Sequence, residues 1–359
     1  MPARRPRTVR TRVPTRRLPR RPAPNAAIIS ALERIESAGG AAAVEAAPHK
    51  SIEVSHLDKV FFPDAGVTKG DVMRYYVRVA KYILPAIADR PLVLKRTPEG
   101  VNGELFFQQN APDDVPDGVR VDNVAAQGEP QCRFVGGDLP TLLHLVQLGC
   151  ISLDPWMSRI GSLDHPDYSI IDLDPGPGAS FKLVVRVALW VREALDELGL
   201  RAVPKTSGSR GIHIAIPLPR STSYQDSIAT AKQDSIATAK AAAARVVDLH
   251  PRQATVERAL ENRPRGTVYV DCLQNSRGKS VAAAYAVRAK PDATVSAPLT
   301  WDEVVESLDP REFTVRTMPA RVEQHGDLWR EGLKHGNSAS VIRAIATPGG
   351  KPRASAGKK

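Results

Sequence analysis

An apolar strand that runs into two carboxylates is the feature that most restricts how this chain can fold. The segment DYSIIDLDPGPG, residues 167–178, places Asp172 and Asp174 on alternate positions after an apolar stretch. Alternate side chains of a strand project from the same face of a sheet, so the two carboxylates lie together. Like charges at that spacing repel each other unless a cation lies between them. The segment therefore predicts a cation site, with an ordinary Asp-Pro-Gly turn as the alternative.

Helical and strand patterns alternate along most of the chain. Thr68 with Asp71 matches a capping box and predicts a helix to about residue 88. Asp138 and Ser180 are N-cap candidates for two further helices, the second of which ends at Gly199. Strands are expected over residues 92–96, 103–108, 213–218, 266–272 and 281–289. This order predicts an α/β (α+β) fold, in which a mixed β-sheet with flanking helices carries the chemistry on one face.

The positive charge of the chain is concentrated at its two ends. The formal net charge is +11; residues 1–25 hold nine arginines and no acidic residue, and residues 351–359 add four basic residues. An Arg/Pro-rich segment with few large apolar side chains cannot bury enough surface to fold. We therefore expect a disordered arm over residues 1–48, a folded domain over residues 49–337 and a flexible basic tail over residues 338–359.

Charge and composition also limit the partners and the compartment. The arginines of the arm suit binding to nucleic-acid phosphates, because each contact releases counterions. A misplaced start codon and an Arg-rich transit peptide are the alternatives. Three scattered cysteines fit neither a disulfide framework nor a zinc site, and no apolar run approaches the roughly 20 residues that span a bilayer. We therefore expect a cytoplasmic protein without a membrane partner.

The octapeptide QDSIATAK occurs twice in tandem, over residues 225–232 and 233–240. Two copies of eight residues are too few for a repeat array, so a local duplication explains them. Eight residues advance an α-helix by roughly 80° beyond two turns, so a copy inserted within a helix would rotate its buried face. We expect the extra copy at the exposed start of a helix and assign it no function.

Two further segments supply partners for the paired carboxylates. Asp271 ends the apolar strand TVYVD, and a neighbouring place in the sheet would bring it beside the pair. Three carboxylates suit Mg²⁺ or Mn²⁺, and two such ions about 3.5–4 Å apart activate an attacking hydroxyl and stabilise a leaving pyrophosphate. The segment KTSGSRGIHIAIPL, residues 205–218, offers a small-residue loop with Arg210 and His213 for a triphosphate. Such loops and buried histidines are also common without this function.

Together these motifs resemble those of a known family. DYSIIDLDPGPG, KTSGSRGIHIAIPL and GTVYVDCLQNSRGKSVAAAYAVRA, in this order, resemble the motifs of the polymerase domain of bacterial ligase D, in the archaeo-eukaryotic primase superfamily. The resemblance extends from about residue 51 to the segment ARVEQHGDLW. It implies a primase-polymerase that fills gaps and extends DNA ends in non-homologous end joining. It also implies a DNA-end-binding part of about residues 49–150 and a catalytic part of about residues 151–337.

The resemblance further implies roles for individual residues. As ligands of two Mn²⁺ or Mg²⁺ ions and as catalytic residues it identifies Asp172, Asp174 and Asp271. Around the incoming NTP or dNTP it places Ser207, Arg210, His213, Gln274 and Arg288. On the DNA it places Lys59 and Lys69, at the 5′-phosphate across a gap, and Phe106 and Phe107, which stack on template bases.

The sequence departs from the family pattern at three points. Asp154 stands where many relatives have a histidine before Pro-Trp, which leaves the preference between ribonucleotides and deoxyribonucleotides open. Arg210 stands where lysine is frequent, and the segment SHLDK lacks the family asparagine. Because the sequence has neither a K-x-D-G ligase motif nor a nuclease-like histidine cluster, we expect a stand-alone, nucleoid-associated polymerase with a separate DNA ligase and Ku as partners.

Three other functions share parts of this pattern. Gly161-Ser162 precedes the paired carboxylates at the spacing of polymerase β-type nucleotidyltransferases, but Pro166 stands where that fold has a helix. A haloacid-dehalogenase-like phosphatase would use Asp172 as nucleophile, but it requires Thr or Val where Gly176 stands. A non-catalytic DNA-end-binding protein would have no need of three carboxylates.

Overall fold

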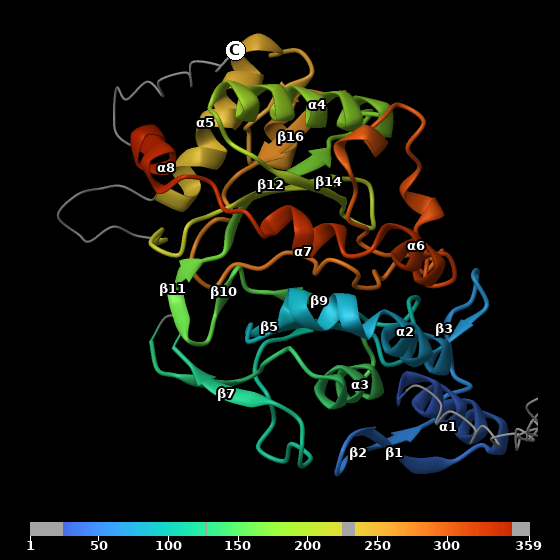
Figure 1. Ribbon diagram of the computed structural model, residues 1–359. Helices are drawn as coiled ribbons and strands as arrows, with labels where there is room; N and C mark the ends of the chain where they lie inside the picture. Colours follow the sequence, from blue (N-terminus) through green and yellow to red (C-terminus); the bar gives the residue numbers. More distant parts are fainter. Residues whose placement is uncertain (1–23, 126–127, 225–233, 347–359) are drawn as a thin grey trace, which may run out of the picture.

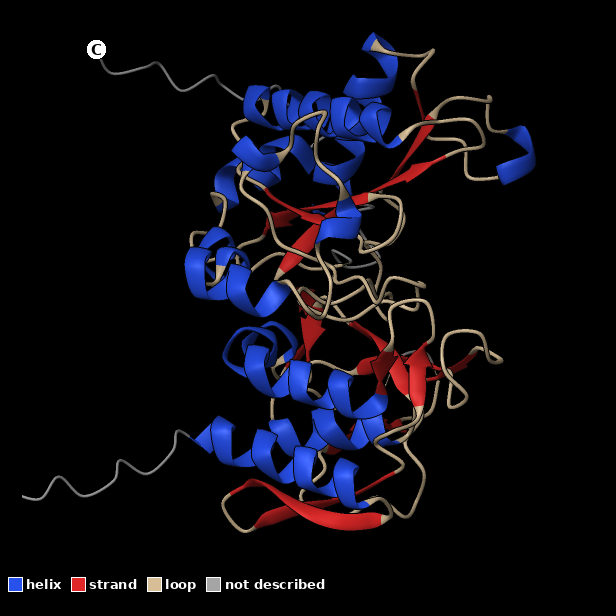
Figure 2. Cartoon of the chain, turned by 90° about the vertical axis from the view of Figure 1, so that its right-hand side faces the viewer, coloured by secondary structure: helices blue, strands red, loops and turns tan. Residues whose placement is uncertain are grey.

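The computed structural model of the protein describes residues 24–125, 128–224 and 234–346. The N-terminal half of the chain lies below the C-terminal half in Figure 1, and Figure 2 shows the same two halves from the side. Each half contains its own main sheet, and one continuous apolar core joins them. No helix of the described residues is long and apolar enough to cross a membrane.

A five-stranded sheet forms the centre of the C-terminal half. Its order is β13-β14-β12-β16-β15, and neighbouring strands are antiparallel except for β15 and β16. The bounds are Tyr168–Pro175 for β12, Val203–Thr206 for β13, Ile212–Pro217 for β14, Ala254–Thr255 for β15 and Val268–Asp271 for β16. This sheet confirms the predicted mixed α/β architecture, and the segment with the paired carboxylates is its central strand.

Two helices pack on the central sheet, α4 (Phe181–Glu197) and α5 (Asp234–Leu249), as Figure 1 shows. Ser180 caps α4 as predicted, since its side chain accepts the N–H of Leu183 at 3.3 Å. Gly199 follows the helix with φ of 69°, a conformation that favours glycine. Local capping signals in the sequence therefore set both ends of α4.

The two faces of β12 have different surroundings. Ser169 Oγ lies 3.4 Å from Thr238 Oγ1 of α5, so positions 169, 171 and 173 face the helices. The alternate positions, which include Asp172 and Asp174, project from the opposite face. The sheet therefore separates an apolar, helix-covered face from a face that carries charged groups.

The N-terminal half is built around α2 (Lys69–Ile87), which is buried along most of its length. The predicted capping box is present, with Thr68 as N-cap and reciprocal hydrogen bonds to Asp71 at 3.0 Å. Tyr75 reaches across to the C-terminal half, where its hydroxyl donates to the carbonyl of Tyr285 at 2.7 Å. This helix therefore connects the two halves of the fold.

Shorter elements complete the structure. Asp138 is the N-cap of α3 (Leu139–Gln147), as predicted. The main N-terminal sheet has the order β6-β5-β9, with bounds Phe106–Gln108, Leu92–Arg96 and Cys150–Pro155. The remaining elements are β3 (Val60–Phe62), β4 (Val67–Thr68), β7 (Val121–Val124), β8 (Gln131–Phe134), β10 (Ser158–Arg159), β11 (Ser162–Pro166), α6 (Met318–His325) and α7 (Leu328–Leu333).

The prediction of disorder over residues 1–48 is wrong for residues 24–47. These form α1 (Pro24–Ala38) and β1 (Ala41–Ala47), and β1 pairs with β2 (Lys50–Ser55). Ile28 and Leu32 of α1 are buried in the common core. The prediction failed because the apolar side chains of α1 were averaged with the arginine-rich segment that precedes them. Those arginines, in residues 1–23, lie outside the described residues.

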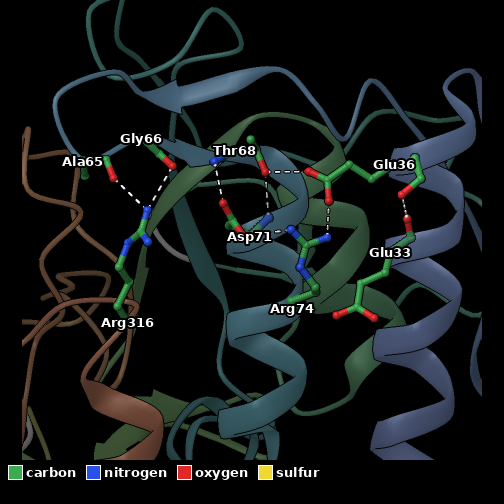
Figure 3. Close-up of polar contacts among 9 residues, drawn as sticks. Glu33, Glu36, Ala65, Gly66, Thr68, Asp71, Arg74 and Arg316 are labelled. Atoms are coloured by element: carbon green, nitrogen blue, oxygen red, sulfur yellow. Dashed lines mark hydrogen bonds and ion pairs between the residues drawn. The ribbon is translucent and has the colours of Figure 1, made fainter.

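Polar contacts hold α1 against the start of α2 (Figure 3). Glu36 accepts a hydrogen bond from Thr68 Oγ1 at 2.8 Å and forms an ion pair with Arg74, which is buried. Arg74 also pairs with Asp71 at 2.7 Å. Gly70 leaves room for this contact, because a Cβ there would lie 2.7 Å from a Glu36 oxygen. The segment before residue 49 is therefore part of the folded domain.

Two further predictions differ from the structure. The predicted flexible tail contains α8 (Ala339–Ala346), whose Ile342 is buried, while residues 347–359 lie outside the described residues. Residues 281–289 do not form a strand. Tyr285 within them has φ of 67°, and the segment makes scattered hydrogen bonds to separate parts of the chain instead of pairing with one strand.

The second copy of the octapeptide starts α5, and its Ile236 and Ala239 are buried. The first copy lies outside the described residues, so the predicted position of an extra copy at an exposed helix start stays a prediction.

Candidate active site

Four polar side chains form a row across four neighbouring strands of the central sheet. The register pairs Lys205 of β13 with His213 of β14. It pairs His213 with Asp172 of β12, and Asp172 with Asp271 of β16. Residues directly opposite on antiparallel strands share a face and lie about 5 Å apart. Asp174, two positions beyond Asp172, shares this face, so the fold brings three carboxylates together next to a histidine and a lysine.

The electrostatics of the row show that the carboxylates repel one another. Burial, together with the charges of Asp172 and Asp271, raises the pKa of Asp174 to about 6. Burial also acts to raise the pKa of Asp172, but His213 and the cations beyond it outweigh burial, and the net pKa is lowered. The site therefore has an excess of negative charge on the side of Asp174.

These residues fit a divalent cation. Asp172 Oδ1 is buried without a hydrogen bond of good geometry, and carboxylate oxygens are the ligands that Mg²⁺ and Mn²⁺ prefer. Asp271 accepts hydrogen bonds from the N–H of Leu273 at 2.7 Å and from Gln274 Nε2 at 3.0 Å. Among the described residues, no three potential ligand groups converge closely enough to hold an ion as they lie.

A buried lysine holds His213 in place. Lys205 Nζ donates to Ser296 Oγ at 2.7 Å and lies 2.7 Å from His213 Nδ1. When Lys205 is protonated, its ammonium group has donors only, so Nδ1 then accepts and the ring proton lies on Nε2, 3.2 Å from Asp172 Oδ1. Burial, and secondarily the charge of Arg288, lowers the pKa of Lys205 to about 7. Burial also lowers the pKa of His213, which favours a neutral imidazole.

The loop between β13 and β14 is shaped by its own side chains. Ser207 Oγ accepts the N–H groups of Ser209 and Gly211, both at 3.1 Å. Arg288 Nη1 donates to the carbonyl of Ser207 at 2.5 Å. Gly208 has φ of 68°, and a Cβ there would lie 2.5 Å from the Arg288 side chain, so only glycine fits. The loop therefore forms a fixed turn next to a guanidinium group.

Four of the five predicted nucleotide-binding residues lie around this loop, and one does not. Arg210 is exposed, and its positive charge acts on Asp174. Ser207, His213 and Arg288 complete the group on the β13–β14 side of the carboxylates. Gln274 lies on the other side, where it donates to Asp271. The roles of all five remain predictions.

Known proteins match both the sequence and the fold. The family model of the LigD primase-polymerase domain matches residues 68–329. The multifunctional non-homologous end joining protein LigD of Pseudomonas aeruginosa is 31% identical over 317 residues, 87% of this chain and 36% of that protein. The bifunctional LigD of Bacillus subtilis is 32% identical over 77% of this chain and 43% of that protein. The polymerase domain of Mycobacterium tuberculosis ligase D, solved in complex with DNA, has a TM-score of 0.71 and 28% identity, covering 80% of this chain and 99% of that domain.

The chain belongs to the LigD primase-polymerase family. It is a nucleotidyltransferase of the primase-polymerase type, which confirms the resemblance read from the motifs. The chain spans 36% and 43% of the length of the two curated LigD relatives named above. Gly161-Ser162 lies at the turn between β10 and β11, not before a helix, so the polymerase β-type alternative has no structural support.

The two lysines predicted at a 5′-phosphate are neighbours at the start of α2 in this LigD-type domain. The N–H of Lys69 donates to the carbonyl of Lys59 at 2.8 Å. Lys69 is buried, donates to the carbonyl of Ser55 at 2.9 Å, and has its pKa lowered to about 8 by burial and by Lys59. Lys59 pairs with Glu99 at 2.7 Å. Two adjacent cations at a helix N-terminus favour an anion, although their role stays a prediction.

The two phenylalanines predicted to stack on bases are both exposed. Phe106 and Phe107 lie on the edge strand β6, with 40% and 63% of their surface accessible. Arg96 and Lys95, their partners on β5, lie over the rings at 5.1 and 5.6 Å from the centroids. Exposed aromatic rings beside cations suit a single-stranded nucleic acid, and stacking on them remains our prediction.

Two lysines that shape the site were not predicted from the sequence. Lys205 supports His213, and Lys95 pairs with the buried Asp154 at 2.6 Å. Each lies within a short apolar strand, in the segments LVLKR and AVPKT. A lysine in an apolar strand requires a buried partner, so that pattern was the signal that could have identified them.

Proposed function

We propose that the chain is a template-directed nucleotidyltransferase that fills gaps and extends 3′ ends at DNA double-strand breaks, releasing pyrophosphate. The observation that carries the proposal is the register, which puts the Asp172–Asp271 pair in line with His213 and Lys205, on the two strands that the loop around Ser207 joins. Nucleotidyl transfer requires a cation site next to a phosphate-binding site, because both the attacking hydroxyl and the leaving pyrophosphate develop negative charge.

Asp172, Asp174 and Asp271 are the residues that would hold the two Mn²⁺ or Mg²⁺ ions. When bound, such ions help to deprotonate the 3′-hydroxyl and neutralise the pyrophosphate. The chain itself contributes a fixed array of carboxylates. His213, supported by Lys205, sets the position of Asp172, and the N–H of Leu273 sets that of Asp271.

The incoming nucleotide is assigned to the β13–β14 side of the carboxylates. Arg210 and Arg288 supply positive charge for the triphosphate, and Ser207 and His213 supply polar groups of fixed orientation. We assign Gln274 a positioning role at Asp271, since it donates to that carboxylate at 3.0 Å.

The DNA is assigned to the N-terminal half. Lys59 and Lys69 would bind the 5′-phosphate on the far side of a gap, and Phe106 and Phe107 would stack on template bases at ~1–3 kcal/mol per base. The solved complex of the M. tuberculosis domain with DNA supports a DNA partner. We further propose that a DNA ligase and Ku act with this chain on broken chromosomal DNA.

The test is primer extension on a gapped duplex, with ATP against dATP and Mn²⁺ against Mg²⁺. We expect templated incorporation that depends on either ion. Asp172→Asn should abolish it, whereas the exposed Asp122→Asn should not. A wild-type protein that binds gapped DNA without incorporating any nucleotide under these conditions would support the non-catalytic alternative.

A further inference from the structure

A cavity of about 530 Å³ opens beside the carboxylates on the β16 side of the row. Asp174, Tyr269 and Asp271 form its wall on the sheet, and Leu273 extends that wall beyond β16. The other walls carry four cations from three segments of the chain. They are Lys240 of α5, Arg258 and Arg263 between β15 and β16, and Lys279 after β16.

Most of this positive charge has no partner in the part of the chain that the structure describes. Among the described residues, the side chains of Lys240, Arg258 and Lys279 form no ion pair and no hydrogen bond, and all three are exposed. Arg263 differs, because it stacks on Tyr269 at 3.9 Å and donates to backbone carbonyls. The four cations of the cavity outnumber the two carboxylates of its sheet wall, Asp174 and Asp271, so the part of the cavity away from the carboxylates favours an anionic ligand.

The position of the cavity determines which anion it binds. The proposed triphosphate site lies on the β13–β14 side of the carboxylates, so pyrophosphate leaves on that side. In an in-line displacement the attacking hydroxyl approaches phosphorus from the side opposite the leaving group. The cavity lies on that opposite side, beyond Asp271. The strand that carries the 3′-hydroxyl must therefore pass through or beside it.

We propose that this cavity binds the backbone phosphates of the primer strand next to its 3′ end, through Lys240, Arg258 and Lys279. This inference rests on the nucleotidyltransferase function proposed above. Cations from three separate segments suit a strand with several phosphates better than one compact anion. The side chain of Leu273, 37% exposed, adds apolar surface for a sugar.

The proposal also gives a place to the duplicated octapeptide. Ile236 and Lys240, one helical turn apart on α5, both belong to the second copy and both line the cavity. The lysine that ends the repeat thus faces the reaction centre.

Binding without catalysis tests the proposal first. The probe is a fluorescent duplex with a recessed 3′ end, titrated by anisotropy over a series of KCl concentrations without nucleotide. Lys240→Gln combined with Lys279→Gln should make the slope of log K against log salt shallower by roughly 2, because each duplex phosphate contact contributes about 0.9. Lys50→Gln combined with Arg252→Gln, two exposed cations outside the cavity, should leave the slope unchanged. An unchanged slope in the first double variant would overturn the proposal.

A chemical double-mutant cycle then identifies the strand. Uncharged methylphosphonates at the two linkages next to the primer 3′ end should weaken binding to wild type, but should weaken binding to the Lys240→Gln/Lys279→Gln variant no further. The same replacement in the template strand should weaken both proteins by equal factors. Equal factors on the primer strand, or coupling on the template strand instead, would overturn the assignment.

Failure of the proposed function gives a different result. If the wild type shows the expected slope and coupling but incorporates no nucleotide, the proposed strand site stands and the proposed polymerase function fails. If the double variant incorporates nucleotide at the normal maximal rate and binds the primer with unchanged affinity, but has a raised KM for the nucleotide, the cavity binds the triphosphate. That result would overturn the inference.

Discussion

Replacing Asp174 by asparagine should make the metal-free protein more stable and abolish nucleotide incorporation. In the folded protein Asp174 stands on the same face as two other carboxylates, and burial with their charges raises its pKa from 3.8 to about 6. Above pH 6 the carboxylate is ionised in both the folded and the unfolded state, but only the folded state contains the repulsion. Asparagine has nearly the same shape without the charge, so it removes that repulsion.

The magnitude follows from the pKa. A rise of about two in the pKa corresponds to about 3 kcal/mol. The carboxylate is partly desolvated by its surroundings, but the residue as a whole remains accessible to water, so screening reduces the penalty to roughly 1–2 kcal/mol. The sign is fixed by linkage. A carboxyl group with a raised pKa contributes no penalty to folding below pH 3.8. The penalty grows between pH 3.8 and about 6 and is complete above that range. The advantage of the variant should therefore be absent at pH 3.5 and complete at pH 7.

The assay is urea unfolding in EDTA at several pH values, repeated with Mn²⁺. A saturating ligand of the folded state adds about 3 kcal/mol at 100 times its Kd, so Mn²⁺ should make wild type the more stable protein and should affect the variant much less. Asp122→Asn, on the exposed strand β7, is the control. A variant that is less stable than wild type in EDTA at pH 7, or that gains as much from Mn²⁺ as wild type, would refute the carboxylate-cluster reasoning.

Three further outcomes test other parts of the structure. Changing Lys59 and Lys69 together to alanine should lower extension of 5′-phosphorylated gaps to the level of unphosphorylated ones; a retained preference for phosphate would place its site elsewhere. Lys205→Met tests the lowered pKa of Lys205, which is about 7 in the folded protein against 10.5 in the unfolded chain. Between these values only the unfolded state binds the proton, so from about pH 7 to 9 the wild type should gain about 1.4 kcal/mol of stability per pH unit over the variant. A difference in urea unfolding that does not change with pH would contradict that pKa. Glu36→Gln should cost about 1–3 kcal/mol, because it weakens the ion pair of the buried Arg74; an unchanged Tm would show that this ion pair does not stabilise the fold.

The elements that the sequence predicted correctly depend on nearby residues. The capping box of Thr68 and Asp71 and the caps at Asp138 and Ser180 are each complete within four residues, so the pattern alone identifies the helix start. The sheet is different. Whether Asp271 lies beside Asp172 depends on which strands are neighbours, and 98 residues of chain separate the two; the motif spacing of the family supplied that information, and periodicity did not.

The errors have physical reasons as well. The segment before residue 49 contains α1, whose Ile28 and Leu32 gain stability only by packing on the domain, and a reading of local composition cannot include that gain. Residues 281–289 have the composition of a strand, but no neighbouring strand offers them a continuous ladder. The buried position of Lys205 was not predicted, because its partners, His213 and Ser296, belong to two other segments of the chain.

The resemblance implies that Asp154, which stands where many relatives have a histidine, lies near the sugar of the incoming nucleotide. An acid there could accept a hydrogen bond from a 2′-hydroxyl, but one of its oxygens already accepts Lys95 Nζ at 2.6 Å, and the other lies 3.4 Å from Ser152 Oγ. A ribose that binds to Asp154 would therefore compete with Lys95 for the carboxylate. The same lysine lies 5.6 Å from the ring centroid of Phe107, on which we propose that the template stacks. If a template base stacks on Phe107 as proposed and displaces Lys95 from the ring, we expect the pairing of Lys95 with Asp154 to change, which would couple template binding to sugar selection through one side chain.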